Sequence, residues 1–235
     1  MPKISQNIKK PSKKHQPRGL TILHDDSAIL VVEKVSGLLT MSNNRVRENT
    51  VYYLLTNYVR KGNSKSRNRI FIVHRLDRDT SGVLVFAKTA EAKRFLQDQW
   101  QGFSKKYYAV IQGMLAEKEG VISSYLAENA VHKMYSVQDP EKGKLAKTGY
   151  KVLRESKNYS LVEIKLLTGR KNQIRVHFSD KGCPVAGDKI YGEKRSDIRR
   201  LALHAGSLTI LHPTTKEPMT FDTKIPALFN ALLNR

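Results

Sequence analysis

The sequence is poor in cysteine and in long apolar runs, and both absences narrow the classes of protein to consider. Its 235 residues include one cysteine, Cys183, which excludes an intramolecular disulfide and leaves no thiolate cluster for a metal. No apolar run approaches membrane-spanning length, and the N-terminal region lacks the apolar segment of a signal peptide. We therefore expect a cytoplasmic protein that is not inserted in a membrane.

Acidic residues are also scarce, since 21 Asp and Glu side chains stand against 42 Lys and Arg side chains, and the formal net charge is +21. A compact domain with this self-repulsion usually has a polyanionic partner, and nucleic acid is the most common one. The cations are partly clustered, because residues 1–19 and 60–69 contain many of them and no acid. We see no amphipathic basic helix that would point instead to an anionic membrane surface.

The chain divides into a polar N-terminal segment and a longer region patterned like a folded domain. Residues 1–19 are rich in lysine, proline and polar side chains, with almost no large apolar residues. This composition predicts a disordered basic arm that can order on RNA. Residues 20–235 are expected to form one domain, since 40% of the chain is apolar and can supply a packed core.

Apolar periodicity predicts strands and helices mixed along this domain, without a repeated strand–helix–strand unit. Strands are expected at residues 28–34, 70–73, 83–87, 105–113, 159–169 and 203–212. Helices are expected at residues 50–59, after an N-cap at Thr89, at residues 172–182 and after Pro226. Many strands with few helices indicate an α+β fold with a mixed, largely antiparallel central sheet flanked by helices and loops.

The most unusual segment is HRLDRDTSG, residues 74–82, which lies between two of the predicted strands. It places Asp77 and Asp79 beside Arg75 and Arg78, and this spacing alone favours a charged surface turn. The alternative is a reactive site, because a carboxylate beside an arginine stays ionised and can act as a nucleophile or a base. Such a carboxylate needs no cofactor.

A third interpretation of the same segment is a magnesium-dependent phosphate-transfer site, because Asp77 and Asp79 superficially match the haloacid-dehalogenase signature. Two features count against it. Position 81 is serine where that pattern requires threonine or valine, and Arg75 and Arg78 would repel Mg²⁺. No metal is therefore expected.

A second basic constellation lies in LLTGRKNQIRVHF, residues 166–178. The plain interpretation is a helix start that packs on the sheet through Ile174 and Phe178, four residues apart. The alternative is an anion site, in which Arg170, Lys171 and backbone N–H groups of the helix start hold a phosphate. Arg175 follows the core-facing Ile174 and could reach an adjoining pocket.

Two adjacent tyrosines, Tyr107 and Tyr108, lie in one predicted strand and must point to opposite faces of it. One of them is expected in the core of the domain. The other would then be able to stack on a base or a sugar, as aromatic side chains do in nucleic-acid sites.

Taken together and in this order, six segments resemble the RluA-type family of RNA pseudouridine synthases. They are HRLDRDTSG at 74–82, KKYYAVIQG at 105–113, NAVHKMYSV with GKLAKTGYKVL at 129–153, LLTGRKNQIRVHF at 166–178, GCPVAGDKIYG at 182–192 and LALHAGSLTILHP at 201–213. The resemblance covers about residues 20–228 and implies the pseudouridine synthase catalytic fold. Two positions depart from the family pattern, with Val35 where proline is usual and Asn172 where histidine is usual.

The resemblance implies that the protein isomerises specific uridines to pseudouridine in structured RNA, either ribosomal or transfer RNA, without a metal or another cofactor. It implies that Asp77 is the catalytic aspartate, acting as a nucleophile or a base after the target nucleotide is flipped out. Arg175 is then expected to pair with Asp77, Arg75 to contact the flipped-out nucleotide, and Tyr107 to pack against the base. The alternative is a non-catalytic, basic RNA-binding protein on the same fold.

Further RNA contacts are expected from cations outside the immediate site. These candidates are Lys61, Arg67 and Arg69 in the basic loop, Arg170 and Lys171 beside the helix start, and the pairs Lys194-Arg195 and Arg199-Arg200. Many family members carry an N-terminal S4 RNA-binding domain, whereas only about twenty residues precede Leu20 here. A standalone catalytic domain that acts as a monomer is therefore expected.

Overall fold

The computed structural model describes residues 16–42, 48–192 and 198–234. The predicted arm at residues 1–19 lies almost entirely outside the described residues, as do Lys194 and Arg195. Within the described ranges, no helix combines the length and the apolar character needed to cross a membrane.

In this described part of the chain, one sheet of eleven strands forms the centre of the fold. Its order is β1-β2-β4-β10-β5-β9-β8-β6-β7, with β3 beside β4 and β11 beside β10. The strands are β1 (Leu20–Asp25), β2 (Ile29–Lys34), β3 (Phe71–Ile72), β4 (Ser81–Ala87), β5 (Ser104–Gln112), β6 (Glu119–Glu128), β7 (Met134–Val137), β8 (Lys144–Glu155), β9 (Tyr159–Leu166), β10 (Leu203–Leu211) and β11 (Pro218–Asp222). The described pairs are antiparallel apart from β4 with β10, which confirms the predicted α+β class and the largely antiparallel sheet.

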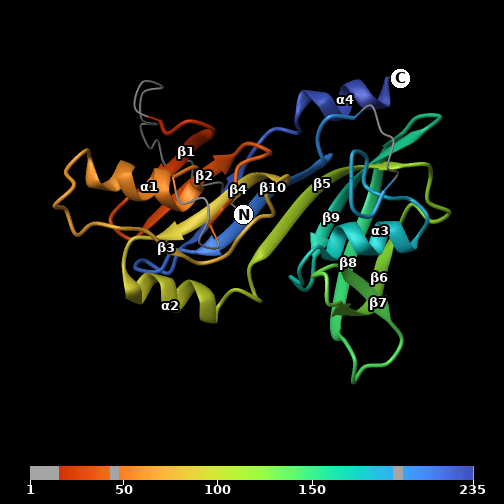
Figure 1. The fold of residues 1–235 in the computed structure, drawn as a ribbon, viewed down its shortest axis with the longest axis horizontal. Helices are drawn as coiled ribbons and strands as arrows, with labels where there is room; N and C mark the ends of the chain where they lie inside the picture. The colour runs from red at the N-terminus through yellow and green to blue at the C-terminus, as the bar shows by residue number, and fades with distance from the viewer. Residues whose placement is uncertain (1–15, 43–47, 193–197, 235) are drawn as a thin grey trace.

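Helices cover the left half of the sheet on both of its faces, as Figure 1 shows. Helix α1 (Val51–Arg60) packs through Leu55 against Leu30 and Leu84 of the neighbouring strands. Helix α2 (Ala90–Asp98) packs on the opposite face, where Leu96 shares a cluster with Val85. Because helices cover both faces of β2 and β4, the side chains on both faces are buried. This burial explains why the two strands are nearly continuous apolar runs.

The right half of the sheet is covered by α3 (Gln173–Asp180) and α4 (Ala227–Leu233) (Figure 1). Phe178 of α3 shares a cluster with Ile111 of β5, whereas Phe229 of α4 packs with the adjacent residue Val110. Successive strand residues point to opposite faces, so the two helices lie on opposite sides of β5. The halves meet along β10 and β5, which pair with each other at the middle of the sheet.

Helix starts follow the predicted capping signals. The hydroxyl of Thr89 accepts a hydrogen bond from the N–H of Ala92 (3.1 Å), and the hydroxyl of Thr50 accepts one from Tyr53 (3.2 Å). Pro226 directly precedes α4. The predicted N-cap at Thr89 and the helix after Pro226 are therefore confirmed.

Several strands were missed by the sequence analysis, namely β1, β6, β7, β8 and β11. Strands β6 and β8 have many exposed residues, so polar side chains interrupt their apolar pattern. The strand expected at residues 70–73 is shortened to Phe71–Ile72, and the one expected at 159–169 ends at Leu166. After it the chain turns, and the N–H groups of Leu167 and Thr168 both bond to the carbonyl of Lys147.

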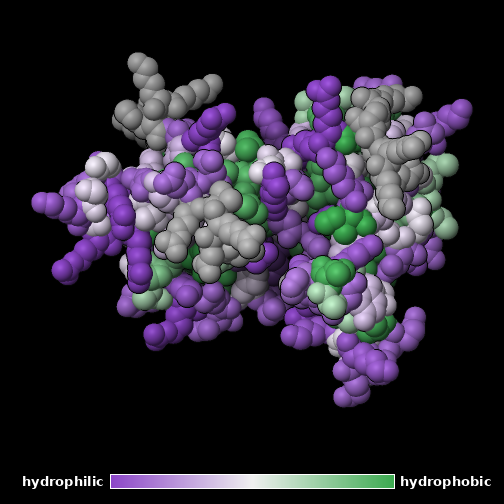
Figure 2. Space-filling view, in the orientation of Figure 1, coloured by the Kyte–Doolittle hydropathy of each residue, from purple (hydrophilic) through white to green (hydrophobic). Residues whose placement is uncertain are grey.

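Hydrophilic side chains cover most of the face seen in Figure 2, and apolar side chains reach it in small separate areas. The same view shows the surface hollowed where the left and right halves meet. A binding or catalytic site is therefore expected in this hollow between the halves.

Candidate active site

The loop between β3 and β4, which carries HRLDRDTSG, is fixed on both sides of Asp77. Before Asp77, the hydroxyl of Thr40 donates to the carbonyl of Leu76 (2.7 Å) and accepts from the N–H of Leu76 (3.3 Å). After it, the N–H of Thr80 donates to the carbonyl of Asp77 (3.2 Å) and closes a turn. Leu76 and Thr80 are both buried, so the backbone that carries Asp77 is anchored in the core.

The end of the loop joins β4 to β10 in the parallel pair at the middle of the sheet. Gly82 has a φ of +118°, and a Cβ there would lie 2.1 Å from the carbonyl oxygen of Ala205, so only glycine fits. The Ser81 hydroxyl accepts from Arg200 Nη2 (2.7 Å) and lies 2.8 Å from His204 Nδ1. Burial, with the charge of Arg200, lowers the pKa of His204 to about 4, so its ring is neutral.

Lys34 at the end of β2 also holds this loop, although its side chain is fully buried. Its Nζ donates to the carbonyls of Val35 (3.0 Å), Leu38 (2.8 Å) and Arg78 (3.0 Å). Burial lowers the pKa of Lys34 to about 8, and the negative charges of the two loop aspartates oppose this fall. Lys34 thus ties the segment after β2 to the loop that carries Asp77.

His74, the first residue of the loop motif, makes a structural contact. Its Nε2 accepts from the N–H of Val85 (3.1 Å), and its ring centroid lies 4.2 Å from that of Trp100. Burial, with a smaller effect of the Lys105 charge, lowers the pKa of His74 to about 3. The ring is therefore neutral and can accept the Val85 hydrogen bond.

These anchors place Asp77 on the wall of a cavity of about 450 Å³ between the two halves of the sheet. Its charged and aromatic lining consists of His74, Arg75, Asp77, Trp100, Lys105, Tyr107, Arg170, Lys171 and Arg175. Six of the sequence-predicted residues therefore meet at one cavity: Asp77, Tyr107, Arg175, Arg75, Arg170 and Lys171. Among the described residues that line the cavity, Asp77 is the only acid.

Arg175 of α3 lies beside Asp77 but has a closer acidic partner. Its Nη1 is 3.8 Å from Asp77 Oδ2, whereas its Nε and Nη2 donate to Asp188 Oδ2 (2.7 Å) and Oδ1 (2.8 Å). The Asp188 carboxylate is fully buried, which raises its pKa, but the hydrogen bonds and charge of Arg175 outweigh burial and lower that pKa overall. The guanidinium also lies over the ring of Tyr191, 5.0 Å from its centroid, and donates to Asn172 Oδ1 (3.1 Å).

Tyr107 on β5 points into the cavity, and Tyr108 points to the opposite face, as the strand alternation predicted. Burial raises the pKa of Tyr107 well above its ordinary value, and the negative charge of Asp77 raises it further. The phenol therefore keeps its proton at neutral pH. Tyr108 packs instead in the cluster of α4.

The three remaining predicted residues at the cavity differ in whether other protein groups bind their charged side chains. Arg75 is exposed, and Arg170 Nε donates to the carbonyl of Leu145 (3.1 Å). Lys171 Nζ is held by Glu128 Oε1 (2.6 Å) and by a backbone carbonyl. At the helix start, the Arg170 N–H donates to Gln173 Oε1 (3.0 Å), so that N–H is already satisfied within the protein.

The second aspartate of the motif faces a different space. Asp79 lines a neighbouring hollow of about 380 Å³, together with Asp188 and Arg200. Among the described residues, no group of three or more His, Cys, Asp or Glu side chains is arranged to hold a metal ion. Asp77 and Asp79 thus do not converge on one cavity, which a paired-aspartate metal site requires.

Comparison with known proteins places this chain in a family. The family model for RNA pseudouridylate synthase matches residues 28–180, a range that contains Asp77, Tyr107 and Arg175. The chain belongs to the RNA pseudouridylate synthase family. It is therefore an RNA pseudouridine synthase, an isomerase that acts on uridine in RNA.

Individual relatives of the synthase agree with this assignment. An uncharacterized RNA pseudouridine synthase of Bacillus subtilis is 35% identical over 212 residues, which are 88% of this chain and 69% of the relative. The ribosomal large subunit pseudouridine synthase D of Nitrosomonas europaea is 36% identical over 227 residues, which are 91% of this chain and 64% of the relative. The chain thus spans about two thirds of the length of these relatives.

A solved structure of related fold is that of human RNA pseudouridylate synthase domain containing 4. It has a TM-score of 0.74 and 25% sequence identity, and the match covers 91% of each chain. This likeness confirms the predicted catalytic fold of the synthase.

Sequence reasoning missed three residues that shape the site of the synthase. Asp188 lies in the GCPVAGDKIYG segment, which resembles the family but has no pattern that indicates a chemical role for Asp188. Lys34 and Thr40 were also left without a role, because a buried lysine and a single threonine carry no signal in composition or spacing. If the sequence had predicted that Arg175 is buried, it would also have indicated an acidic partner such as Asp188, because a buried charge needs a partner.

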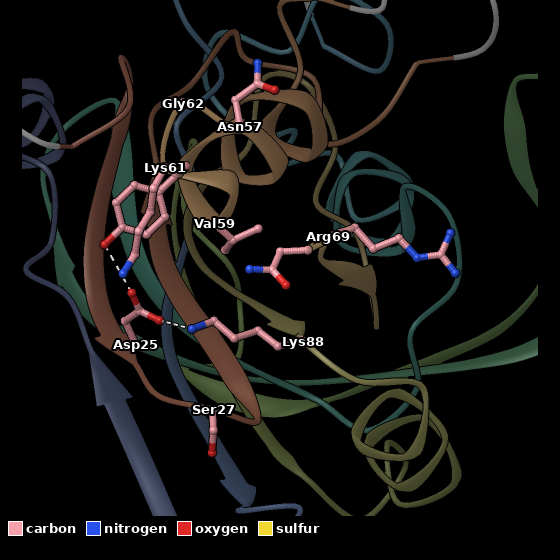
Figure 3. Close-up of a pocket in the computed structure, with 10 residues that line it drawn as sticks. Asp25, Ser27, Asn57, Val59, Lys61, Gly62, Arg69 and Lys88 are labelled. Atoms are coloured by element: carbon pink, nitrogen blue, oxygen red, sulfur yellow. Dashed lines mark hydrogen bonds and ion pairs between the residues drawn. The ribbon is translucent and has the colours of Figure 1, made fainter. Parts of the chain in front are cut away.

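The basic-loop candidates of the synthase do not reach the Asp77 cavity. Lys61 and Arg69 line another hollow, of about 800 Å³, at the end of α1, and Arg67 is exposed in the same loop. Figure 3 shows this hollow, with Asp25 joined to Lys88 by an ion pair on one side. None of these three cations lines the cavity of Asp77 itself.

Proposed function

We propose that Asp77 is the catalytic residue of this synthase and that its substrate is ribosomal or transfer RNA. One observation carries the proposal: Asp77 is the only acid among the described residues of a cavity that is also lined by five cations. Such a cavity attracts the phosphates of RNA and holds one carboxylate among its cations. The carboxylate is also within 4 Å of a guanidinium that is itself fixed by Asp188.

The isomerisation requires the N1–C1′ glycosidic bond of uridine to break and a C5–C1′ bond to form. The uracil stays in the site and rotates between these steps, and the C5 proton is finally lost. The Asp77 carboxylate supports two routes: it attacks C1′ as a nucleophile, or it removes the C2′ proton as a base. Tyr107, protonated and facing Asp77 across the cavity, packs against the base and assists proton transfer at C5.

The target uridine must leave its stack to enter this cavity. Extrusion costs a few kcal/mol and is cheapest in loops and single strands. Arg75, exposed at the rim of the cavity, contacts the flipped-out nucleotide in this proposal. Arg170 is similarly exposed and supplies charge for the flanking phosphates.

Release of tritium from RNA labelled at C5 of uridine tests the catalytic role. We expect the wild-type protein to release tritium from bulk ribosomal and transfer RNA, and Asp77→Asn to release none. Asp79→Asn is the matched control, because Asp79 lies two residues away and faces another hollow, and it should retain activity. Full activity of Asp77→Asn would refute the role of Asp77, and stable RNA binding without product would favour the non-catalytic alternative.

Uridine deuterated at C2′ separates the two routes. Abstraction of the C2′ proton predicts a primary isotope effect on pseudouridine formation, whereas attack on C1′ predicts none. Pseudouridine mapping of cellular RNA, with and without the gene, then tests the target. Loss of signal from ribosomal or transfer RNA is the expected result, and loss confined to other RNA would contradict it.

A further inference from the structure

Three hollows follow one another along a single stretch of chain that ends at Asp77. Asn68 and Arg69 line the hollow at the end of α1, and Arg69 with Phe71 lines a second hollow of about 610 Å³. His74 and Asp77 then line the catalytic cavity. The first two hollows share Arg69, so they lie next to each other.

A second wall follows the same order. Lys88, after β4, lines the hollow at the end of α1, Lys93 in α2 lines the middle hollow, and Trp100 lines the catalytic cavity. The two walls contact each other, because Gln97 Nε2 donates to the carbonyl of Val73 (3.3 Å). Two segments of the chain therefore lead in parallel from the end of α1 to Asp77.

The charge along this path is positive and little neutralised. Within the described residues, none of the ion pairs within 4 Å involves Lys61, Arg69 or Lys93. Among the described residues that line the two outer hollows, Asp25 is the single acid, and it is already paired with Lys88 (Figure 3). In Figure 3 the guanidinium of Arg69 points away from this pair, and it lies 4.7 Å from the centroid of the Phe71 ring.

Aromatic side chains alternate with these cations. Tyr52, Tyr53 and Phe71 line the middle hollow, and Tyr53 is 37% exposed. Exposed aromatic faces combined with backbone-tracking cations are the arrangement that binds unpaired nucleotides, because every base can stack and every phosphate can be neutralised. A paired duplex would hide its base faces from such side chains.

We infer that the middle hollow and the hollow at the end of α1 together form a binding track for single-stranded RNA, continuous with the catalytic cavity. The inference rests on the proposed function in one respect: it assumes that the strand in the track is the RNA substrate whose target uridine occupies the catalytic cavity. The track takes unpaired nucleotides on one side of the target uridine, with stacking on Tyr53 and phosphates near Arg69 and Lys61. The synthase would then prefer targets whose neighbours on that side are unpaired.

Binding of a fluorescent oligoadenylate of about twelve nucleotides tests the track without any isomerisation, because the probe contains no uridine. Tyr53→Ala should weaken binding about 5- to 150-fold, as expected for the loss of one base stack. Tyr135→Ala is the matched control, since Tyr135 is also exposed but lies on β7, away from the three hollows, and it should bind like wild type. Circular dichroism verifies that both variants are folded.

The salt dependence of the same binding tests the cations. Removing two phosphate contacts with Lys61→Gln/Arg69→Gln should reduce the slope of log K against log salt by about 1.4, because each contact on a single strand contributes about 0.7. Lys157→Gln, an exposed lysine between β8 and β9, is the control and should leave the slope unchanged. An unchanged slope in the double variant, together with wild-type affinity of Tyr53→Ala, would overturn the track.

Two further outcomes separate this inference from the proposed function. Loss of oligoadenylate affinity in Tyr53→Ala supports the track even if Asp77→Asn keeps full tritium-release activity. Duplex RNA of the same length should depend less on Tyr53 than the single strand does. Equal dependence of duplex and single strand would refute a single-strand track.

Discussion

The guanidinium of Arg175 clasps the buried carboxylate of Asp188 with two hydrogen bonds and leaves its third nitrogen 3.8 Å from Asp77. The stronger ion pair is therefore the one behind the site. Asp188 is further held by the N–H groups of Ile190 (2.9 Å) and Tyr191 (3.1 Å). Through these contacts Asp188, which does not line the Asp77 cavity, fixes the cation that faces Asp77.

Asp188→Asn should destabilise the fold by about 3–5 kcal/mol, because it leaves the buried charge of Arg175 without its partner. Urea denaturation measures this loss in the free energy of unfolding. The exposed Glu119 of the Lys151 pair is the control, and Glu119→Gln should have no measurable effect. Adding Arg175→Gln to Asp188→Asn should recover part of the lost stability, since the unpaired charge is then removed. Strictly additive losses would contradict this coupling.

Gly82→Ala should prevent stable folding or cost at least about 4 kcal/mol, because the new methyl group would overlap the backbone of Ala205. Gly62→Ala separates this clash from backbone strain. Gly62 also has a positive φ, +76°, but no atom lies within 4 Å of its Cβ position, so a cost of only about 1–2 kcal/mol is expected. Similar thermal midpoints for the two variants would show that the contact of β4 with β10 is looser than described.

Acidification should weaken the fold through three histidines. Burial lowers the pKa values of His74, His177 and His204 to about 3, 4 and 4, whereas each titrates near pH 6.5 in the unfolded chain. As the pH falls from about 6.5 toward 4, the unfolded chain binds protons that the folded chain does not. The free energy of unfolding therefore decreases, by at most about 1.4 kcal/mol per pH unit for each histidine.

Urea titrations at several pH values measure this slope, and His177→Gln should make it shallower. The glutamine amide can still bond to Thr148 and Ser124, the two hydroxyl partners of His177, so the fold should survive. A free energy of unfolding that rises on acidification in this interval would contradict the assignment of neutral buried rings.

Lys34→Met should lower both stability and activity, because the carbonyls of Val35 and Leu38 lose this donor and the Arg78 carbonyl, in the loop of Asp77, keeps only its bond from the Gly37 N–H. Each carbonyl that is left unsatisfied inside the protein costs about 1–3 kcal/mol. Denaturation and tritium release measured together at a temperature where the variant is folded distinguish the two effects. Lys151→Met on the exposed face of β8 should change neither, and full activity of Lys34→Met would show that the lysine does not hold the loop.

The parts of the fold that were predictable carry strong local signals. The runs of β2 and β4 are continuously apolar because helices cover both faces, and the threonine before α2 caps it as expected. Strands β6 and β8 gave no such signal, since both have many exposed residues and polar side chains interrupt their apolar pattern. Their pairing depends on partners more than on their own sequence, which is a general limit of β-strand prediction.

The residues of the candidate site also divide into those that the sequence could predict and those that it could not. Asp77 stood out because its carboxylate lies in a motif of recognisable order, and the alternation of β5 indicated that Tyr107 and Tyr108 separate. Nothing in the sequence indicated which tyrosine faces the cavity, because this depends on the helices packed on either side. Lys34 was unpredictable for a similar reason, since only the folded chain brings three carbonyls to one buried ammonium group.

The parallel contact of β4 with β10 also has a consequence for synthesis on the ribosome. Ser81 and His204 are 123 residues apart in the chain, so the middle of the sheet is filled only after the long segment between them has been synthesised. Until then β4 keeps part of one edge unpaired, and the loop that presents Asp77 lacks its anchor at Ser81 and Gly82. The nascent chain, basic enough to meet RNA early, thus gains an ordered Asp77 loop only after β10 has been synthesised.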